Sequence, residues 1–130
     1  MAHPNVDLVQ RLYAGYMSGD QATLLASLDP ELRWHNSGFD DTAGTYEGID
    51  AVLGYLFADN HMDDYRLDVV DVLASDSRVA VIARTSGRRG DQRLSNDFVQ
   101  ILRVDDGRVR EVWNYYWDQR AIAEFMAIPA

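Results

Sequence analysis

The stretch that decides the fold is Asp105-Asp106-Gly107-Arg108-Val109-Arg110-Glu111-Val112-Trp113-Asn114-Tyr115-Tyr116-Trp117-Asp118. It opens with a tight-turn signal, because Gly107 can adopt the positive φ that a short hairpin loop requires. The β-branched and aromatic residues that follow predict a strand. Four aromatic side chains in five positions carry more apolar surface than a solvated hairpin can expose. We therefore expect both faces of this strand to be covered, and one of them to line a cavity.

The composition indicates one ordinary globular domain that spans residues 1–130, with 47% hydrophobic and 25% charged residues. The chain has no cysteine, which excludes a disulfide framework, a thiolate nucleophile and a cysteine metal site. The first five residues lack the features of a signal peptide and no apolar run is long enough to span a membrane, so a cytoplasmic location is expected. The net charge of −9 disfavours nucleic acids and anionic membranes as partners.

Helical spacing of apolar residues dominates the first half of the chain, and alternation dominates the second half. Helices are predicted at 6–18, 21–28, from 48 to the Asp59-Asn60-His61 segment, and at 119–126, where Asp118 is expected to cap the helix. Strands are predicted at 32–36, 65–73, 78–86, 93–104 and 108–117, and a loop at 37–46. The short links between the last four strands favour an antiparallel meander. The pattern is typical of an α+β fold with helices packed on one face of a curved sheet.

Several local motifs, in this order and spacing, resemble the nuclear transport factor 2-like superfamily, and in particular its SnoaL-like branch. The resemblance covers nearly the whole chain. Its motifs are Val9-Gln10-Arg11 running to Ser18-Gly19-Asp20, Asp29-Pro30-Glu31-Leu32-Arg33-Trp34-His35, Ala43-Gly44-Thr45-Tyr46-Glu47-Gly48-Ile49-Asp50-Ala51-Val52, and Asp106-Gly107-Arg108-Val109 before the aromatic strand. The resemblance implies a cone-shaped fold in which a curved antiparallel sheet and three helices enclose an apolar cavity, often in a homodimer packed through the sheet. Members include ketosteroid isomerases, polyketide cyclases, epoxide hydrolases, dehydratases and binding proteins without a reaction, so fold alone does not decide function.

The resemblance also places the family's acid–base positions on residues that are not acids. The isomerase base falls on Asn36, its donor Asp on Gln100 and its donor Tyr on Leu12. The inward Asp of the cyclases and epoxide hydrolases falls on Asn114, seven residues after Gly107. The epoxide hydrolase trio keeps Asn36 and Arg84 but replaces its second Asp by Ser86, which disfavours that mechanism.

Asn36, Gln100 and Asn114 are therefore candidate site residues that orient a polar ligand, or amides that satisfy one another inside a small cavity. A base, if one is used, must come from elsewhere, and Asp40 on the loop at the cavity mouth is the candidate. His35 alternates with Trp34 and Asn36 and is expected to face away from the cavity. The candidate ligand-binding residues are Tyr16, Trp34, Arg84, Phe98 and Tyr116. No cluster has metal-site spacing, and no cofactor is expected.

Two functions are consistent with the sequence. The preferred hypothesis is a cofactor-independent isomerase, cyclase or dehydratase that acts on an apolar, oxygenated substrate of polyketide or terpenoid type. The alternative is a non-catalytic ligand-binding or dimerising protein, because amides occupy the acid positions. The two differ in whether Asp40, Asp41, Asp97, Asp118 or His35 reaches the cavity.

Overall fold

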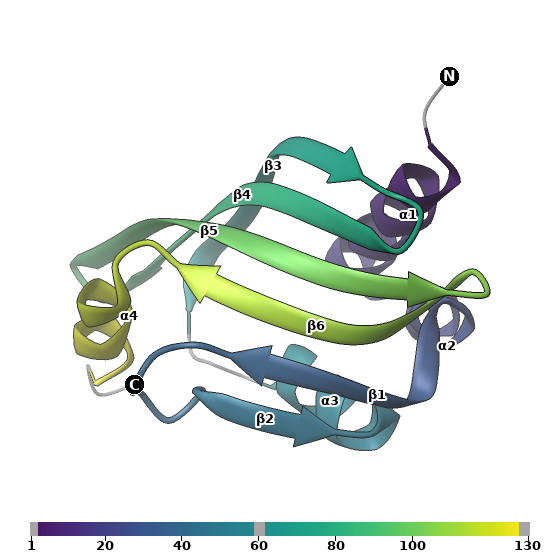
Figure 1. Cartoon of the computed structure of the whole chain (residues 1–130). Helices are drawn as coiled ribbons and strands as arrows, with labels where there is room; N and C mark the ends of the chain where they lie inside the picture. Colours follow the sequence, from purple (N-terminus) through teal and green to yellow (C-terminus); the bar gives the residue numbers. More distant parts are fainter. Residues whose placement is uncertain (1–2, 59–61, 128–130) are drawn as a thin grey trace.

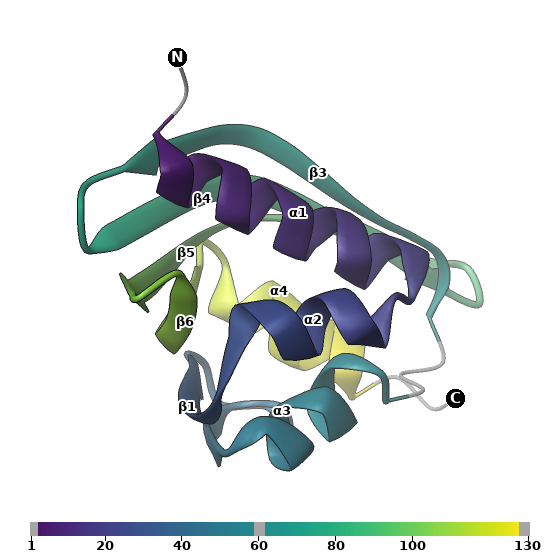
Figure 2. The ribbon, with the colours of Figure 1, turned by 90° about the vertical axis from the view of Figure 1, so that its right-hand side faces the viewer.

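The computed structural model describes residues 3–58 and 62–127. They form an α+β fold in which a curved six-stranded sheet wraps around helices, as Figures 1 and 2 show from two sides. The elements in chain order are α1 (Pro4–Ser18), α2 (Gln21–Ser27), β1 (Leu28–Asn36), β2 (Gly44–Glu47), α3 (Ile49–Leu56), β3 (Asp63–Ala74), β4 (Arg78–Arg89), β5 (Gln92–Asp105), β6 (Arg108–Tyr116) and α4 (Gln119–Met126). The end predicted for the third helix, at 59–61, lies outside the described residues.

The sheet has the strand order β2-β1-β6-β5-β4-β3. Strands β3 to β6 follow one another as an antiparallel meander, which confirms the prediction from their short links. Strand β1, however, pairs in parallel with β6, so the sheet is mixed. A parallel pair is possible here because the whole middle of the chain, rather than a tight turn, connects the two strands.

Three strands differ most from the expected boundaries. Strand β4 runs three residues past the expected end at 86, to Arg89. Strand β2 begins inside the segment 37–46 that was expected to be a loop, and it pairs with β1. Strand β1 begins at Leu28, so Asp29-Pro30 lies within the strand instead of only ending the helix before it. The register between β1 and β6 shifts between Leu28 and Arg33, and this irregularity accommodates the proline.

The hairpin that joins β5 to β6 has a two-residue loop, which agrees with the short turn that the sequence predicts. Asp106 and Gly107 both have positive φ, 50° and 70°, as a type I′ turn requires. Such a turn matches the right-handed twist of the flanking strands. The turn sets the pairs beside it, Asp105 with Arg108 and Val104 with Val109, and a register shift between Arg103 and Val104 then brings Gln100 opposite Asn114.

Helices α1, α2 and α3 cover the concave face of the sheet (Figure 2). The side chains between the two layers form the main core, and the most deeply buried include Val9, Leu24, Leu28, Leu32, Leu102 and Val112. Helix α4 packs on β5 through a smaller cluster of Leu94, Ile122 and Phe125. The Asp118 carboxylate accepts a hydrogen bond from the Ala121 N–H, which confirms its predicted capping role.

Candidate functional site

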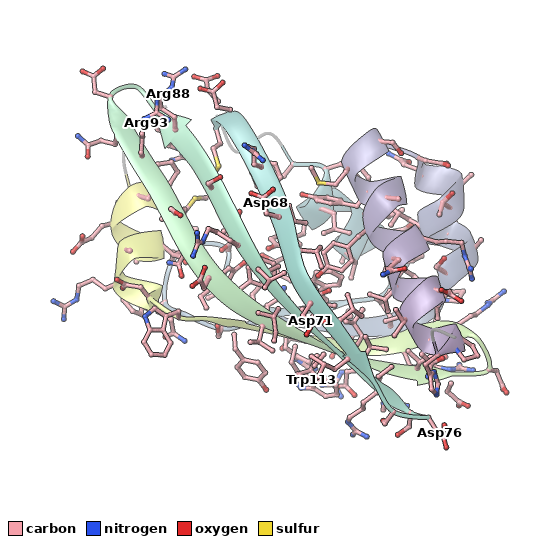
Figure 3. The ribbon with its side chains drawn as sticks, turned by 90° about the horizontal axis from the view of Figure 1, so that it is seen from above. Asp68, Asp71, Asp76, Arg88, Arg93 and Trp113 are labelled. Carbon is pink, nitrogen blue, oxygen red and sulfur yellow. The ribbon has the colours of Figure 1, made fainter. Side chains whose placement is uncertain are left out.

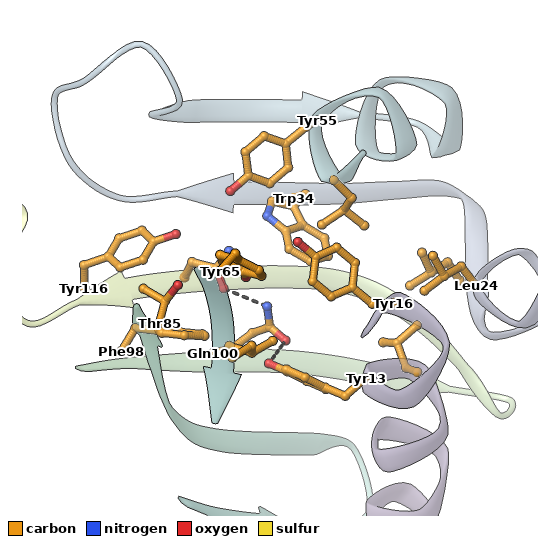
Figure 4. Close-up of a pocket in the computed structure, with 15 residues that line it drawn as sticks. Tyr13, Tyr16, Leu24, Trp34, Tyr55, Tyr65, Thr85, Phe98, Gln100 and Tyr116 are labelled. Carbon is orange, nitrogen blue, oxygen red and sulfur yellow. Dashed lines mark hydrogen bonds between the residues drawn. The ribbon is translucent and has the colours of Figure 1, made fainter. Parts of the chain in front are cut away.

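A cavity lies between the concave face of the sheet and the helices (Figure 4). Its free volume is about 100 Å³. The residues that line it are Leu12, Tyr13, Tyr16, Leu24, Leu28, Trp34, Tyr55, Leu56, Tyr65, Leu67, Thr85, Phe98, Gln100, Asn114 and Tyr116. Most of this wall is aliphatic or aromatic, and its polar groups are uncharged. The cavity therefore suits a ligand that is mainly apolar and carries a few polar atoms.

A second, outer chamber of about 160 Å³ shares with the first the residues Tyr16, Tyr55, Leu56, Tyr65, Thr85 and Tyr116. Helix α4 contributes Ile122 and Met126 to its wall, and Thr42 comes from the segment before β2. The shared residues make the two chambers contiguous. An apolar cavity of about 150 Å³ admits benzene in other proteins, so the two chambers together have room for one or two rings.

Three adjacent strands bring the three amides together. Asn114 on β6 lies opposite Gln100 on β5 and beside Asn36 on β1. Side chains alternate along a strand, so equivalent positions in register point to the same face. All three side chains are buried, with 4% to 6% of their surface exposed.

Two hydrogen-bonding partners, one that can only donate and one that can only accept, fix the orientation of the Asn36 amide. The Trp34 indole N–H can only donate, and it lies 3.1 Å from Asn36 Oδ1. The Thr42 backbone carbonyl can only accept, and it lies 3.0 Å from Asn36 Nδ2. The oxygen of Asn36 therefore points toward the indole and its nitrogen toward the loop.

This orientation determines the rest of the network. Asn114 Nδ2 donates to Asn36 Oδ1 at 2.8 Å, and Gln100 Nε2 donates to Asn114 Oδ1 at 2.8 Å. The Tyr13 hydroxyl donates to Gln100 Oε1 at 2.7 Å (Figure 4). We call Tyr13, Gln100, Asn114 and Asn36 the amide relay. Each of its three amide oxygens accepts at least one hydrogen bond within the fold.

Four of the tyrosine hydroxyls around the cavity are held in the neutral form. Burial raises the pKa of Tyr13 and Tyr16 well above the usual value of 10, and the negative charge of an ionised Tyr65 would raise both further. Burial also raises the pKa of Tyr55 and of Tyr116. These phenols are therefore hydrogen-bonding groups at physiological pH and cannot act as bases.

Most of the residues expected at the site are indeed in the cavity wall. Gln100, Asn114, Tyr16, Trp34, Phe98 and Tyr116 line the inner chamber. Asn36 lies directly behind Asn114 as its hydrogen-bond acceptor. The sequence reasoning did not assign Tyr55, Tyr65 or Thr85 to the site. Helical spacing placed Tyr55 on a buried face, whereas no local signal marked Tyr65 or Thr85.

Arg84 is not where the family resemblance suggested. It lies opposite Asp97 on the outer face of the sheet, where the two side chains form an ion pair at 2.7 Å and are each 56% exposed. Its neighbours Ala83 and Thr85 face inward, so alternation directs Arg84 outward. The expectation that Arg84 contacts a ligand in this cavity is therefore wrong.

The other candidate bases also lie outside both chambers. Asp40 accepts hydrogen bonds from the backbone N–H and the hydroxyl of Thr42. Thr42 lines the second chamber, so Asp40 lies one residue contact away from it, and the charge of Asp40 adds to burial in raising the pKa of Tyr116. His35 lies on the outer face, between Glu111 and Thr45 and stacked on Trp113. Figure 3 shows Trp113 on the side of the sheet away from α1.

Within residues 3–58 and 62–127, no group of three or more His, Asp or Glu side chains is arranged to hold a metal ion. The cavity offers amides and phenols, which are weak metal ligands compared with carboxylate and imidazole. No helix in this described part of the chain is long and apolar enough to cross a membrane.

The sequence profile of the SnoaL-like domain matches residues 9–112. The chain belongs to the SnoaL-like domain family. The chain is similar in sequence to the uncharacterized protein Rv0034 of Mycobacterium tuberculosis. The two are 28% identical over 95% of this SnoaL-like chain and 96% of the length of Rv0034.

Solved structures show the same fold. Bal32a, from a soil-derived mobile gene cassette, is 29% identical with a TM-score of 0.87 over 95% of this chain and 96% of its own. An NTF2-like protein from Burkholderia pseudomallei has 21% identity and a TM-score of 0.84 over 98% and 100% of the two chains. TerC, co-crystallized with polyporic acid, has 21% identity and a TM-score of 0.84 over 97% and 100%. This SnoaL-like protein therefore has the NTF2-like cone fold.

Proposed function

We propose that this SnoaL-like protein binds a small, largely apolar molecule of one or two rings that carries oxygen atoms. The amide relay is the observation that supports the proposal. Buried amides are costly in an apolar wall unless they are hydrogen-bonded, and here three of them occupy facing positions on β1, β6 and β5. Gln100 and Asn114 also line the cavity, so they present polar atoms to whatever fills it.

A pair of variants on the neighbouring strands β6 and β5 tests the binding site. Asn114→Ala removes the centre of the relay and should abolish the thermal stabilisation produced by ligands from a panel of ketones, quinones and phenols. Asp97→Asn changes a residue on β5 that faces away from the cavity, and it should leave the stabilisation unchanged. Stabilisation that survives Asn114→Ala would restrict Asn114 to a packing role.

Turnover is the second candidate function: a cofactor-independent isomerisation, cyclisation or dehydration of a polyketide-like or terpenoid-like substrate. One observation favours it. Asp40 accepts a hydrogen bond from the backbone N–H of Thr42, which lines the second chamber, and its charge contributes to the raised pKa of Tyr116. A movement of the segment between β1 and β2 would bring this carboxylate to a bound substrate as a base.

Asp40→Asn separates the two functions. This variant keeps an acceptor for the Thr42 hydrogen bonds but removes the basic oxygen. If the protein is an enzyme that uses Asp40, turnover of a substrate should fall by about 100-fold or more while affinity stays within a few fold. Unchanged turnover would exclude Asp40 as the base.

Formation of a homodimer through the sheet stays a prediction. Apolar side chains on the outer face of the sheet support it. Ile82, Val99 and Tyr115 lie opposite one another on β4, β5 and β6, and each is at least one-third exposed. Such a continuous apolar row is typical of an interface. Val99→Lys should convert a dimer to a monomer in sedimentation velocity, and a wild-type monomer at all concentrations would contradict the prediction.

A further inference from the structure

The amide relay leaves the cavity with unused hydrogen-bond donors. A primary amide nitrogen carries two hydrogens. Gln100 Nε2 donates one of them to Asn114, and Asn114 Nδ2 donates one to Asn36. Both side chains line the cavity, so one N–H of each remains for a ligand. In folded proteins an unpaired buried N–H is rarer than a carbonyl with one unused lone pair. These two hydrogens therefore favour a ligand group that accepts hydrogen bonds.

We propose that the group recognised in the cavity is the neutral carbonyl oxygen of a ketone or quinone, held between the remaining N–H groups of Gln100 and Asn114. This inference rests on the proposed binding function. The two amides are hydrogen-bonded at 2.8 Å on neighbouring strands, so one oxygen with two lone pairs can lie within reach of both nitrogens. A hydrocarbon of the same shape would leave both N–H groups unpaired.

The surroundings favour a neutral carbonyl over an anionic oxygen. The cavity wall is mainly apolar and contains no Arg, Lys or His among the described residues that line it. Taking an ionised oxygen from water into such a wall is unfavourable without a counter-charge. The same effect of burial raises the pKa of the neighbouring Tyr13 and Tyr16 hydroxyls. A ligand with an acidic enol is therefore bound in its protonated form.

Two ligands of matched shape test the carbonyl. Titration calorimetry at pH 7 compares 1-tetralone with tetralin, which has the same two rings without the oxygen. We expect 1-tetralone to bind at least about tenfold more tightly, the effect of one net hydrogen bond at the upper end of its range. Equal affinities would overturn the carbonyl inference but leave the binding function intact. Binding of neither compound would overturn the proposed function for ligands of this size, and the inference with it.

The residues are tested with Gln100→Met, which replaces the amide by an apolar side chain of similar length. The ratio of the two affinities should fall toward one while tetralin still binds, which also shows that the cavity is intact. Asp97→Asn should keep the wild-type ratio. A preference for 1-tetralone that survives Gln100→Met would overturn the assignment.

Two measurements on the unaltered protein remain informative if that variant does not fold. The infrared carbonyl band of bound 1-tetralone should lie at lower wavenumber than in an alkane solvent, and a band at the alkane position would refute the hydrogen bonds. The affinity for 2-hydroxy-1,4-naphthoquinone should fall about tenfold per pH unit above the pKa of this ligand, because only the neutral form binds. An affinity independent of pH would refute the preference for neutral ligands.

Discussion

Asn114→Asp tests the direction of the amide relay with a change of one atom. The native amide accepts from Gln100 through its oxygen and donates to Asn36 through its nitrogen. A protonated carboxyl can do both, because it has one O–H donor and a carbonyl acceptor. An ionised carboxylate cannot donate, and it would place a negatively charged oxygen against Asn36 Oδ1 at the position where the amide nitrogen now lies 2.8 Å away.

The size of the effect follows from burial. Position 114 is 4% exposed and has no cation among its hydrogen-bond partners, so the fold should raise the pKa of the introduced carboxyl by about three units above its unfolded value of about 3.9. The variant is then close to the wild type below about pH 4, where the carboxyl is protonated in both states. As the pH rises it loses about 1.4 kcal/mol per unit, because only the unfolded state ionises, and it reaches a loss of about 4 kcal/mol near pH 7.

The assay is urea unfolding followed by tryptophan fluorescence from pH 5.5 to 8, away from the sequence pI of about 4.5. The control is Ser95→Asp, which introduces the same carboxyl at an exposed position on β5. The free-energy difference for the control should not change with pH. A pH-independent difference for Asn114→Asp, or one below about 1 kcal/mol at pH 7, would show that the amide nitrogen is not a buried donor.

Three further perturbations follow from the structure. Burial raises the folded-state pKa of Tyr13, Tyr16 and Tyr116 above the unfolded value near 10. The stability that their neutral hydroxyls contribute is therefore complete below about pH 10 and is lost as the pH rises further. Absorbance at 295 nm should show these phenols ionising together with unfolding, and ionisation before unfolding would contradict this prediction. The hydrogen bond from His35 lowers the pKa of Glu111 below its ordinary value of 4.5, so the stability lost in Glu111→Gln should be largest near neutral pH. The loss should shrink as the pH falls below 4.5 in urea titrations, and a loss that does not change with pH would contradict it. Leu102→Ala truncates a fully buried side chain and should lower the free energy of unfolding by about 2–5 kcal/mol in the same assay. Leu73 is exposed, so Leu73→Ala should lower it by less than about 1 kcal/mol. Equal losses would contradict the burial of Leu102 in the core.

The sequence predicted what depends on local pattern. The Asp106-Gly107 turn, the strand after it and the cap at Asp118 all have short-range signals in the chain, and all three are present. The parallel pairing of β1 with β6 has no such signal, because it joins segments separated by most of the chain. Strand β2 was missed for a related reason, since four residues that begin with Gly44 and precede Gly48 carry too little pattern to separate a strand from a loop.

The same division applies to the site. The family resemblance predicted that Gln100 and Asn114 face inward, and both line the cavity. The same resemblance failed at Arg84, because alternation along β4 turns Ala83 and Thr85 inward and Arg84 outward. The partners of the amides, the Tyr13 hydroxyl and the Thr42 carbonyl, come from a helix and a loop whose positions depend on the packing of the whole molecule.

The parallel pair of β1 and β6 has a consequence for biosynthesis. Asn36 and Asn114 are 78 residues apart in sequence, yet their side chains are direct hydrogen-bond partners. During translation β1 emerges early with only the short β2 as a partner in the sheet, and its other edge is unpaired until β6 leaves the ribosome. Pairing of β1 with β6 closes a long loop, which slows folding. A nascent chain that ends before residue 108 has neither a complete sheet nor a cavity. The proposed ligand binding therefore requires that β6 has been synthesised and paired.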